Sequence, residues 1–195
     1  MCSSDLRTRF GSTLPVAIAH AGDELTAEDV RLLREANAAG TPEGGTPPQL
    51  VTFDVYKHEA FRAAGARGYQ IKAFALYLCP WRHVVLMDAD AVPLSDPAAL
   101  FDSPQYEDTG ALFFPDFAGT RGRFLRDSDF DLFMSPKAAR DAKLAHADVT
   151  QDSSMLVVDR WRHWYALHAA LHLNLKHAWT DRKSTRLNSS HLVIS

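Results

Sequence analysis

The chain has 195 residues, 46% of them hydrophobic, and its 21 basic and 24 acidic side chains give a formal net charge of −3. A mildly acidic chain without a basic block gives no electrostatic reason to expect a nucleic acid or an anionic membrane as a partner. No segment approaches the roughly 18 apolar residues that a membrane-spanning helix needs, and the composition is that of a globular domain.

The two ends of the sequence are expected not to belong to the protein. Read back through the genetic code, residues 181–195 match a widely used short-read sequencing adapter and the index that follows it. Residues 1–6 match the reverse strand of the same adapter, so both ends are adapter-derived artefacts and are excluded from reasoning about the fold. The biological part is then residues 7–180, open at both ends. Cys79 is its single cysteine, so no disulfide framework is predicted.

Strands and helices are predicted to alternate through the first half of this part. Residues 14–19 and 50–54 are predicted strands. Between them, Thr26 followed by acidic residues is typical of a helix cap, and the helix is expected to run to about Ala39. Residues 69–78 carry apolar side chains at helical spacing, with Lys72 off the apolar stripe.

The strongest strand signal follows this helix. Residues 84–87 are a continuous apolar run, typical of a strand buried on both faces in a parallel sheet. Residues 110–114 and 154–158 are further predicted strands, and residues 161–177 form a long predicted helix without Gly or Pro. This alternation around a central apolar strand predicts an α/β layered fold.

Asp88 and Asp90 come directly after the apolar run. Residues two apart at the end of a strand point the same way, so both carboxylates are expected to face one site. Open α/β sheets bind ligands beyond the carboxyl ends of their strands. Carboxylate oxygens suit Mg²⁺ or Mn²⁺, which proteins commonly hold with one or two carboxylates and substrate phosphates. The pair is therefore predicted to bind such a cation.

Two further Asp-x-Asp patterns occur in the chain, within residues 127–131. They lie in a polar stretch that no predicted strand precedes, and we interpret them as solvated loop.

The residues around Asp88 and Asp90 resemble a known family. The similar segments read YQIKAFAL at 69–76, VVLMDADAVPL at 84–94, DPAALF at 96–101 and YEDTGALFFPD at 106–116. In this order they look like the fungal-type α-mannosyltransferases, including alpha-1,3-mannosyltransferases, which extend mannan and glycoprotein glycans. The resemblance covers most of residues 14–174 and is densest from 69 to 116.

The resemblance implies a GT-A (Rossmann-like) nucleotide-sugar transferase fold, so residues 7–180 would be a partial GT-A glycosyltransferase domain, incomplete at both ends. It implies GDP-mannose as the donor, Mn²⁺ (or Mg²⁺) as the cofactor and a mannose-containing glycan as the acceptor. It also implies a type II membrane protein of the Golgi lumen, whose membrane anchor is expected in the full-length protein. The family's first nucleotide-binding strand is expected before Arg7, and the fragment itself is expected to be inactive.

Site residues also follow from the resemblance. Asp90 would bind the metal directly and Asp88 would contact the metal or the ribose. Lys72 would lie near the diphosphate, and Asp116 near the donor sugar or the acceptor.

The chain departs from the family at residues 152–155, which read Asp-Ser-Ser-Met where the family usually has Glu-Ser-Gly-Gln. Asp152 can replace the glutamate chemically, but Met155 cannot make the hydrogen bonds of a glutamine. This departure bears on the sugar specificity. Asp116 and Asp152 are the candidates for a catalytic carboxylate, and no catalytic residue is assigned.

Two other functions stay open at this point. A phosphatase of the haloacid dehalogenase type would use Asp88 as nucleophile and Asp90 as general acid, although that motif normally opens its domain and here about eighty residues precede it. A glycosyltransferase-like domain that only binds glycans is the second alternative, and the retained pair of aspartates argues against it.

Overall fold

The computed structural model describes residues 6–39, 41, 45–65, 68, 70–115, 151–175 and 191–194. The chain divides into two compact units, one formed by Met1–Leu112 with Ser154–Ser195 and the other by Phe113–Ser153, and each is described by itself. Within the described ranges, no helix is both long enough and apolar enough to span a membrane.

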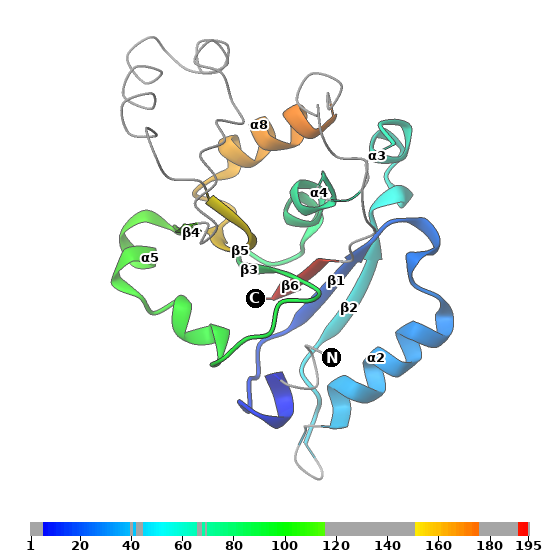
Figure 1. Ribbon diagram of the computed structural model, residues 1–195, viewed down its shortest axis with the longest axis vertical. Helices are drawn as coiled ribbons and strands as arrows, with labels where there is room; N and C mark the ends of the chain where they lie inside the picture. The colour runs from blue at the N-terminus through cyan, green and yellow to red at the C-terminus, as the bar shows by residue number, and fades with distance from the viewer. Residues whose placement is uncertain are drawn as a thin grey trace. The chain divides into compact units, whose positions relative to one another are not determined.

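The described residues form a mixed α/β structure (Figure 1). Its strands are β1 (Val16–His20), β2 (Leu50–Asp54), β3 (His83–Asp88), β4 (Ala111–Pro115), β5 (Gln151–Asp159) and β6 (His191–Ile194). Its helices are α2 (Ala27–Ala39), α3 (Glu59–Ala63), α4 (Gln70–Leu78), α5 (Pro104–Thr109) and α8 (Trp164–Leu175), with 3-10 turns η1 (Gly22–Glu24), η2 (Val55–Lys57) and η3 (Pro97–Leu100). The strands and helices that the sequence predicts are confirmed within the described residues, where their ends differ from the predicted ones by a few residues at most.

The sheet has the strand order β2-β1-β6-β3-β5-β4. Strands β1 and β2 are parallel, whereas β6 runs antiparallel to both β1 and β3, and β5 runs antiparallel to β3. Strands β1, β2 and β3 therefore share one direction. The prediction of parallel neighbours for β3 was wrong, because its apolar run reflects burial on both faces, and burial does not fix the direction of the adjacent strands.

Both segments predicted to be adapter-derived contribute to this unit. Leu6 is fully buried, and His191–Ile194 forms β6 between β1 and β3. Strand β6 was not predicted, because residues 181–195 match an adapter sequence and lie outside the predicted fold.

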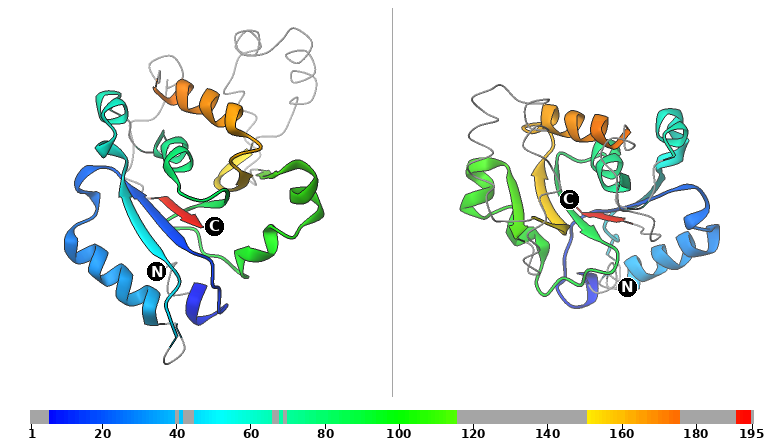
Figure 2. Two further views of the ribbon diagram at one scale, coloured as in Figure 1. Left: turned by 180° about the vertical axis from the view of Figure 1, so that it is seen from behind. Right: turned by 45° about the horizontal axis from the view of Figure 1, so that its top comes forward.

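Helix α4 covers one face of the sheet. Its apolar stripe, including Ile71, Phe74 and Ala75, is buried against Ala19 of β1 and Leu86 of β3. Helix α8 adds Leu171 to the same core, and Figures 1 and 2 show α4 between α8 and the sheet. The core thus fixes α4 against the strand that ends at Asp88.

The turn between β5 and α8 is organised by Asp159. Its carboxylate is 2.6 Å from the Arg82 guanidinium and accepts hydrogen bonds from the backbone N–H groups of Trp161 and Arg162 at 3.0 and 3.1 Å. The next residue, Arg160, is buried and donates to backbone carbonyl oxygens at the end of α4 and just beyond it, those of Tyr77, Cys79 and Trp81. Together these contacts tie β5 to the segment that joins α4 and β3.

Asp159 should make the free energy of unfolding depend on pH below about pH 4. Hydrogen bonds from the Arg82 guanidinium lower the pKa of Asp159 to about 2 from its ordinary 3.8. A carboxyl group with a depressed folded-state pKa stabilises the protein above its ordinary pKa, and this contribution is lost as the pH falls towards 2. Because Arg82 is half exposed, we expect Asp159→Asn to cost about 1–2 kcal/mol at pH 7.

The measurement is urea unfolding of the wild type and Asp159→Asn at pH 7, 5 and 3, with exposed Asp102→Asn as the control. The difference in unfolding free energy should shrink towards pH 3. A difference that stays constant with pH would show that the carboxylate charge plays no part.

Candidate active site

Strand β3 brings the predicted aspartates to the carboxyl edge of the sheet. Its residues Val84–Met87 are buried, Asp88 is partly exposed, and Asp90 is exposed. The strand ends at Asp88, where a turn begins in which the Ala91 N–H donates to the Asp88 carbonyl at 3.0 Å. Side chains alternate in direction only along the strand, which ends at Asp88, so the strand does not fix the direction of the Asp90 side chain. That Asp88 and Asp90 face one site stays a prediction.

Lys72 of α4 reaches Asp88. The Lys72 Nζ lies 2.7 Å from Asp88 Oδ1, and the two side chains are only 9% and 19% exposed. Lys72 is off the apolar stripe, as predicted, but its side chain is buried. Burial is possible because the aliphatic part of the side chain packs against the protein while the ammonium group pairs with a carboxylate. The fold thus brings together two of the predicted site residues from separate elements.

Polar residues also end the two other strands that run in the same direction. His20 ends β1, and its Nδ1 lies 3.2 Å from the Gly22 carbonyl oxygen. Asp54 ends β2 and accepts hydrogen bonds from the N–H groups of Gly22 and Tyr56, both at 2.8 Å. Sequence reasoning did not single out His20 and Asp54, although a polar residue that closes a strand is the signal that would have found them.

The chemistry of Asp88 and Asp90 suits a cation that takes further ligands from a substrate. In the described part of the chain, no three His, Cys, Asp or Glu side chains gather closely enough to hold a metal ion. Mg²⁺ and similar ions are commonly held by one or two carboxylates together with substrate phosphates, and the aspartates fit that pattern. The ammonium of Lys72 adds a positive charge that a phosphate can also use.

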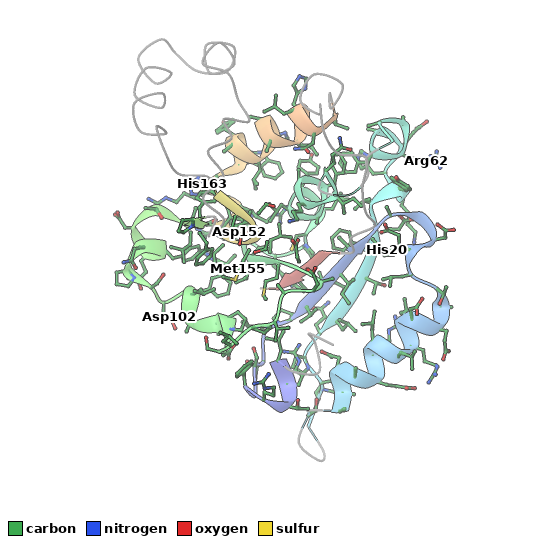
Figure 3. All side chains as sticks on the ribbon, viewed as in Figure 1. His20, Arg62, Asp102, Asp152, Met155 and His163 are labelled. Atoms are coloured by element: carbon green, nitrogen blue, oxygen red, sulfur yellow. The ribbon has the colours of Figure 1, made fainter. Side chains whose placement is uncertain are left out.

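Strand β5 places Met155, one residue of the departure from the family pattern, next to the end of β3. Met155 is the register partner of Met87, the residue before Asp88, and it is partly exposed on β5 (Figure 3). Asp152, the other predicted residue on β5, is also partly exposed but belongs to the second unit. Asp116 and residues 127–131 lie outside the described residues.

The buried Lys72–Asp88 pair lies at the carboxyl edge of an α/β sheet, where such sheets commonly bind ligands. The family is shown by the sequence: the Mannosyl_trans3 model, which describes mannosyltransferases, matches residues 6–186. The chain belongs to this family, which confirms the resemblance.

The curated relatives include fungal enzymes. Alpha-1,2-mannosyltransferase MNN22 of Candida albicans is 43% identical over 70 residues, which are 36% of this chain and 11% of that protein. Alpha-1,2-mannosyltransferase MNN5 of Saccharomyces cerevisiae is 25% identical over 146 residues, covering 55% of this chain and 25% of the relative. Alpha-1,2-mannosyltransferase MNN2 of the same species is 28% identical over 110 residues, which cover 55% of this chain and 17% of that protein. The matches thus span a quarter of these relatives' lengths at most.

Proposed function

We propose that this chain is part of an α-mannosyltransferase that moves mannose from GDP-mannose to a hydroxyl of a mannose-containing glycan, on a GT-A fold. The observation that carries the proposal is the pairing of Lys72 with Asp88, two residues before Asp90, in a member of a mannosyltransferase family. The relatives named as alpha-1,2-mannosyltransferases support the sugar and the reaction class.

Each predicted site residue has a proposed role in this reaction. Asp88 and Asp90 would hold Mn²⁺ or Mg²⁺, which neutralises the charge that develops on the departing diphosphate. Lys72, buried beside Asp88, would place its ammonium against the same diphosphate. Asp116 and Asp152 remain the candidates for a carboxylate near the transferred sugar.

We also propose that the full-length protein is a type II membrane protein that acts in the Golgi lumen, as the family resemblance implies. Microscopy of the tagged full-length protein with a Golgi marker, combined with protease protection of the tag in intact vesicles, tests both the compartment and the orientation.

The test of the reaction uses the full-length natural protein. We would measure GDP-mannose turnover with Mn²⁺, with and without a chelator, beside the hydrolysis of a generic phosphate monoester. Consumption of GDP-mannose that stops when the metal is removed supports the transferase. Monoester hydrolysis without turnover of GDP-mannose would establish the phosphatase alternative, which the family comparison does not support. Glycan binding without either activity would establish the binding-domain alternative.

A further inference from the structure

The Asp88 carboxylate has a cationic partner in the protein itself. Lys72 Nζ is 2.7 Å from Asp88 Oδ1, and both side chains are largely removed from solvent. Asp90, two residues on, is exposed in the turn that follows β3. The two aspartates predicted to hold the cation therefore differ, because one is already paired with an ammonium group and the other faces solvent.

A cation at Asp88 would meet this ammonium. Two positive charges on one carboxylate lie within a few ångströms of each other, and their repulsion is weakly screened at a site with little solvent. Lys72 must therefore lower the affinity of Asp88 for a divalent cation as long as no phosphate adds negative charge to the site. A diphosphate supplies that negative charge and attracts both the ammonium and the cation.

We propose that Lys72 makes cation binding at Asp88 depend on the donor. This inference rests on the proposed function. Without a nucleotide, Lys72 holds Asp88 and the cation binds weakly, through Asp90. When the diphosphate enters, Lys72 and the cation both engage it, and Asp88 becomes available to the metal. Lys72 is thus a positioning residue that couples donor binding to metal binding, and the cation leaves readily once the nucleotide product has gone.

The test measures Mn²⁺ binding to the full-length enzyme by the electron paramagnetic resonance signal of free Mn²⁺. Without a nucleotide, Lys72→Met should bind Mn²⁺ about tenfold more tightly than the wild type, because the competing charge is gone. With saturating Mn²⁺, the same variant should bind GDP about tenfold more weakly, because the diphosphate loses a cationic partner. Lys57→Met, at an exposed lysine of η2, should stay close to the wild type in both measurements.

A merely structural role for Lys72 would not tighten the binding of Mn²⁺, so an unchanged or weaker nucleotide-free affinity in Lys72→Met overturns the proposal. Thermal unfolding shows whether the variant folds. Asp88→Asn provides a second test that leaves Lys72 in place. It should change the nucleotide-free affinity for Mn²⁺ by less than about threefold and lower the affinity in the presence of GDP about tenfold. Equal losses in both conditions contradict the coupling.

The two proposals can fail separately. If the wild type consumes GDP-mannose but Lys72→Met gains no affinity for Mn²⁺, the proposed function stands and the coupling is wrong. If Lys72→Met gains affinity but no GDP-mannose is consumed, the competition for Asp88 is real and the proposed reaction is wrong. If the wild type binds no Mn²⁺ with or without GDP, the coupling is wrong and so is the assignment of Asp88 and Asp90 to a Mn²⁺ site.

Discussion

Asp90→Asn in the full-length enzyme is expected to lower kcat/KM for GDP-mannose turnover by about 10²- to 10³-fold. The substitution removes one negative charge from the carboxylate pair proposed to hold the cation. A cation that stabilises a leaving diphosphate contributes several kcal/mol to transition-state stabilisation. A loss of about 3–4 kcal/mol of that stabilisation corresponds to the expected change in rate. Asp90 is exposed, so its replacement should leave the unfolding temperature nearly unchanged. Turnover is measured over a series of Mn²⁺ concentrations, because weakened metal binding should be partly restored by excess Mn²⁺.

The matched control is Asp102→Asn, which removes the same charge at an exposed position in the turn between η3 and α5 (Figure 3). It should retain at least about half of the wild-type turnover, as expected for an exposed substitution outside the site. Near-normal turnover in Asp90→Asn would remove Asp90 from the metal site. Equal losses in both variants would point to a general effect of charge.

The local features of the fold could be predicted because they depend on neighbours in the sequence. Strand β2 has the predicted bounds, Leu50–Asp54. The helix predicted after Thr26 begins with a reciprocal cap: Thr26 Oγ1 accepts a hydrogen bond from the Asp29 N–H at 3.2 Å, and the Thr26 N–H donates to the Asp29 carboxylate at 2.8 Å. The stripe of α4 was found because helical spacing selects the residues that face the core.

The missed features depend on contacts between distant segments. The burial of Lys72 could not be read from its position off the apolar stripe, since its partner Asp88 lies on another element, 16 positions along the chain. The direction of β5 beside β3 depends on how the chain returns to the sheet, which a hydrophobic pattern does not encode. The family resemblance implies that Lys72 lies near a diphosphate, and the structure adds that its ammonium group pairs with Asp88.

Asp90 lies in the turn beyond the end of β3, where the alternation of a strand no longer predicts which way a side chain points. Alternation predicts that residues two apart in a strand face the same way, but this holds only where the strand continues. Here β3 ends at Asp88. The strand pattern therefore supports Asp88 alone, and the role of Asp90 depends on the resemblance and on the activity test.

Deleting residues 191–195 is expected to destabilise the chain severely. Strand β6 pairs with Val16–Ala19 of β1 on one side and with Val85–Asp88 of β3 on the other. Its loss leaves the backbone N–H and C=O groups of two largely buried strands without these partners, and each unmet buried group costs about 1–3 kcal/mol. We expect loss of the cooperative thermal transition seen by circular dichroism, together with aggregation through the opened strand edges.

The same deletion tests how the natural sheet is completed. If residues 181–195 derive from an adapter, the natural protein must pair the facing edges of β1 and β3 with another segment, and the resemblance offers the nucleotide-binding strand expected before Arg7. The full-length natural protein, which would lack residues 181–195, should then unfold cooperatively although β6 is absent. A cooperative transition retained after deletion of residues 191–195 from this chain would show instead that β1 and β3 need no strand between them. In that case α4 and β5 alone would hold the end of β3, and so Asp88, in position.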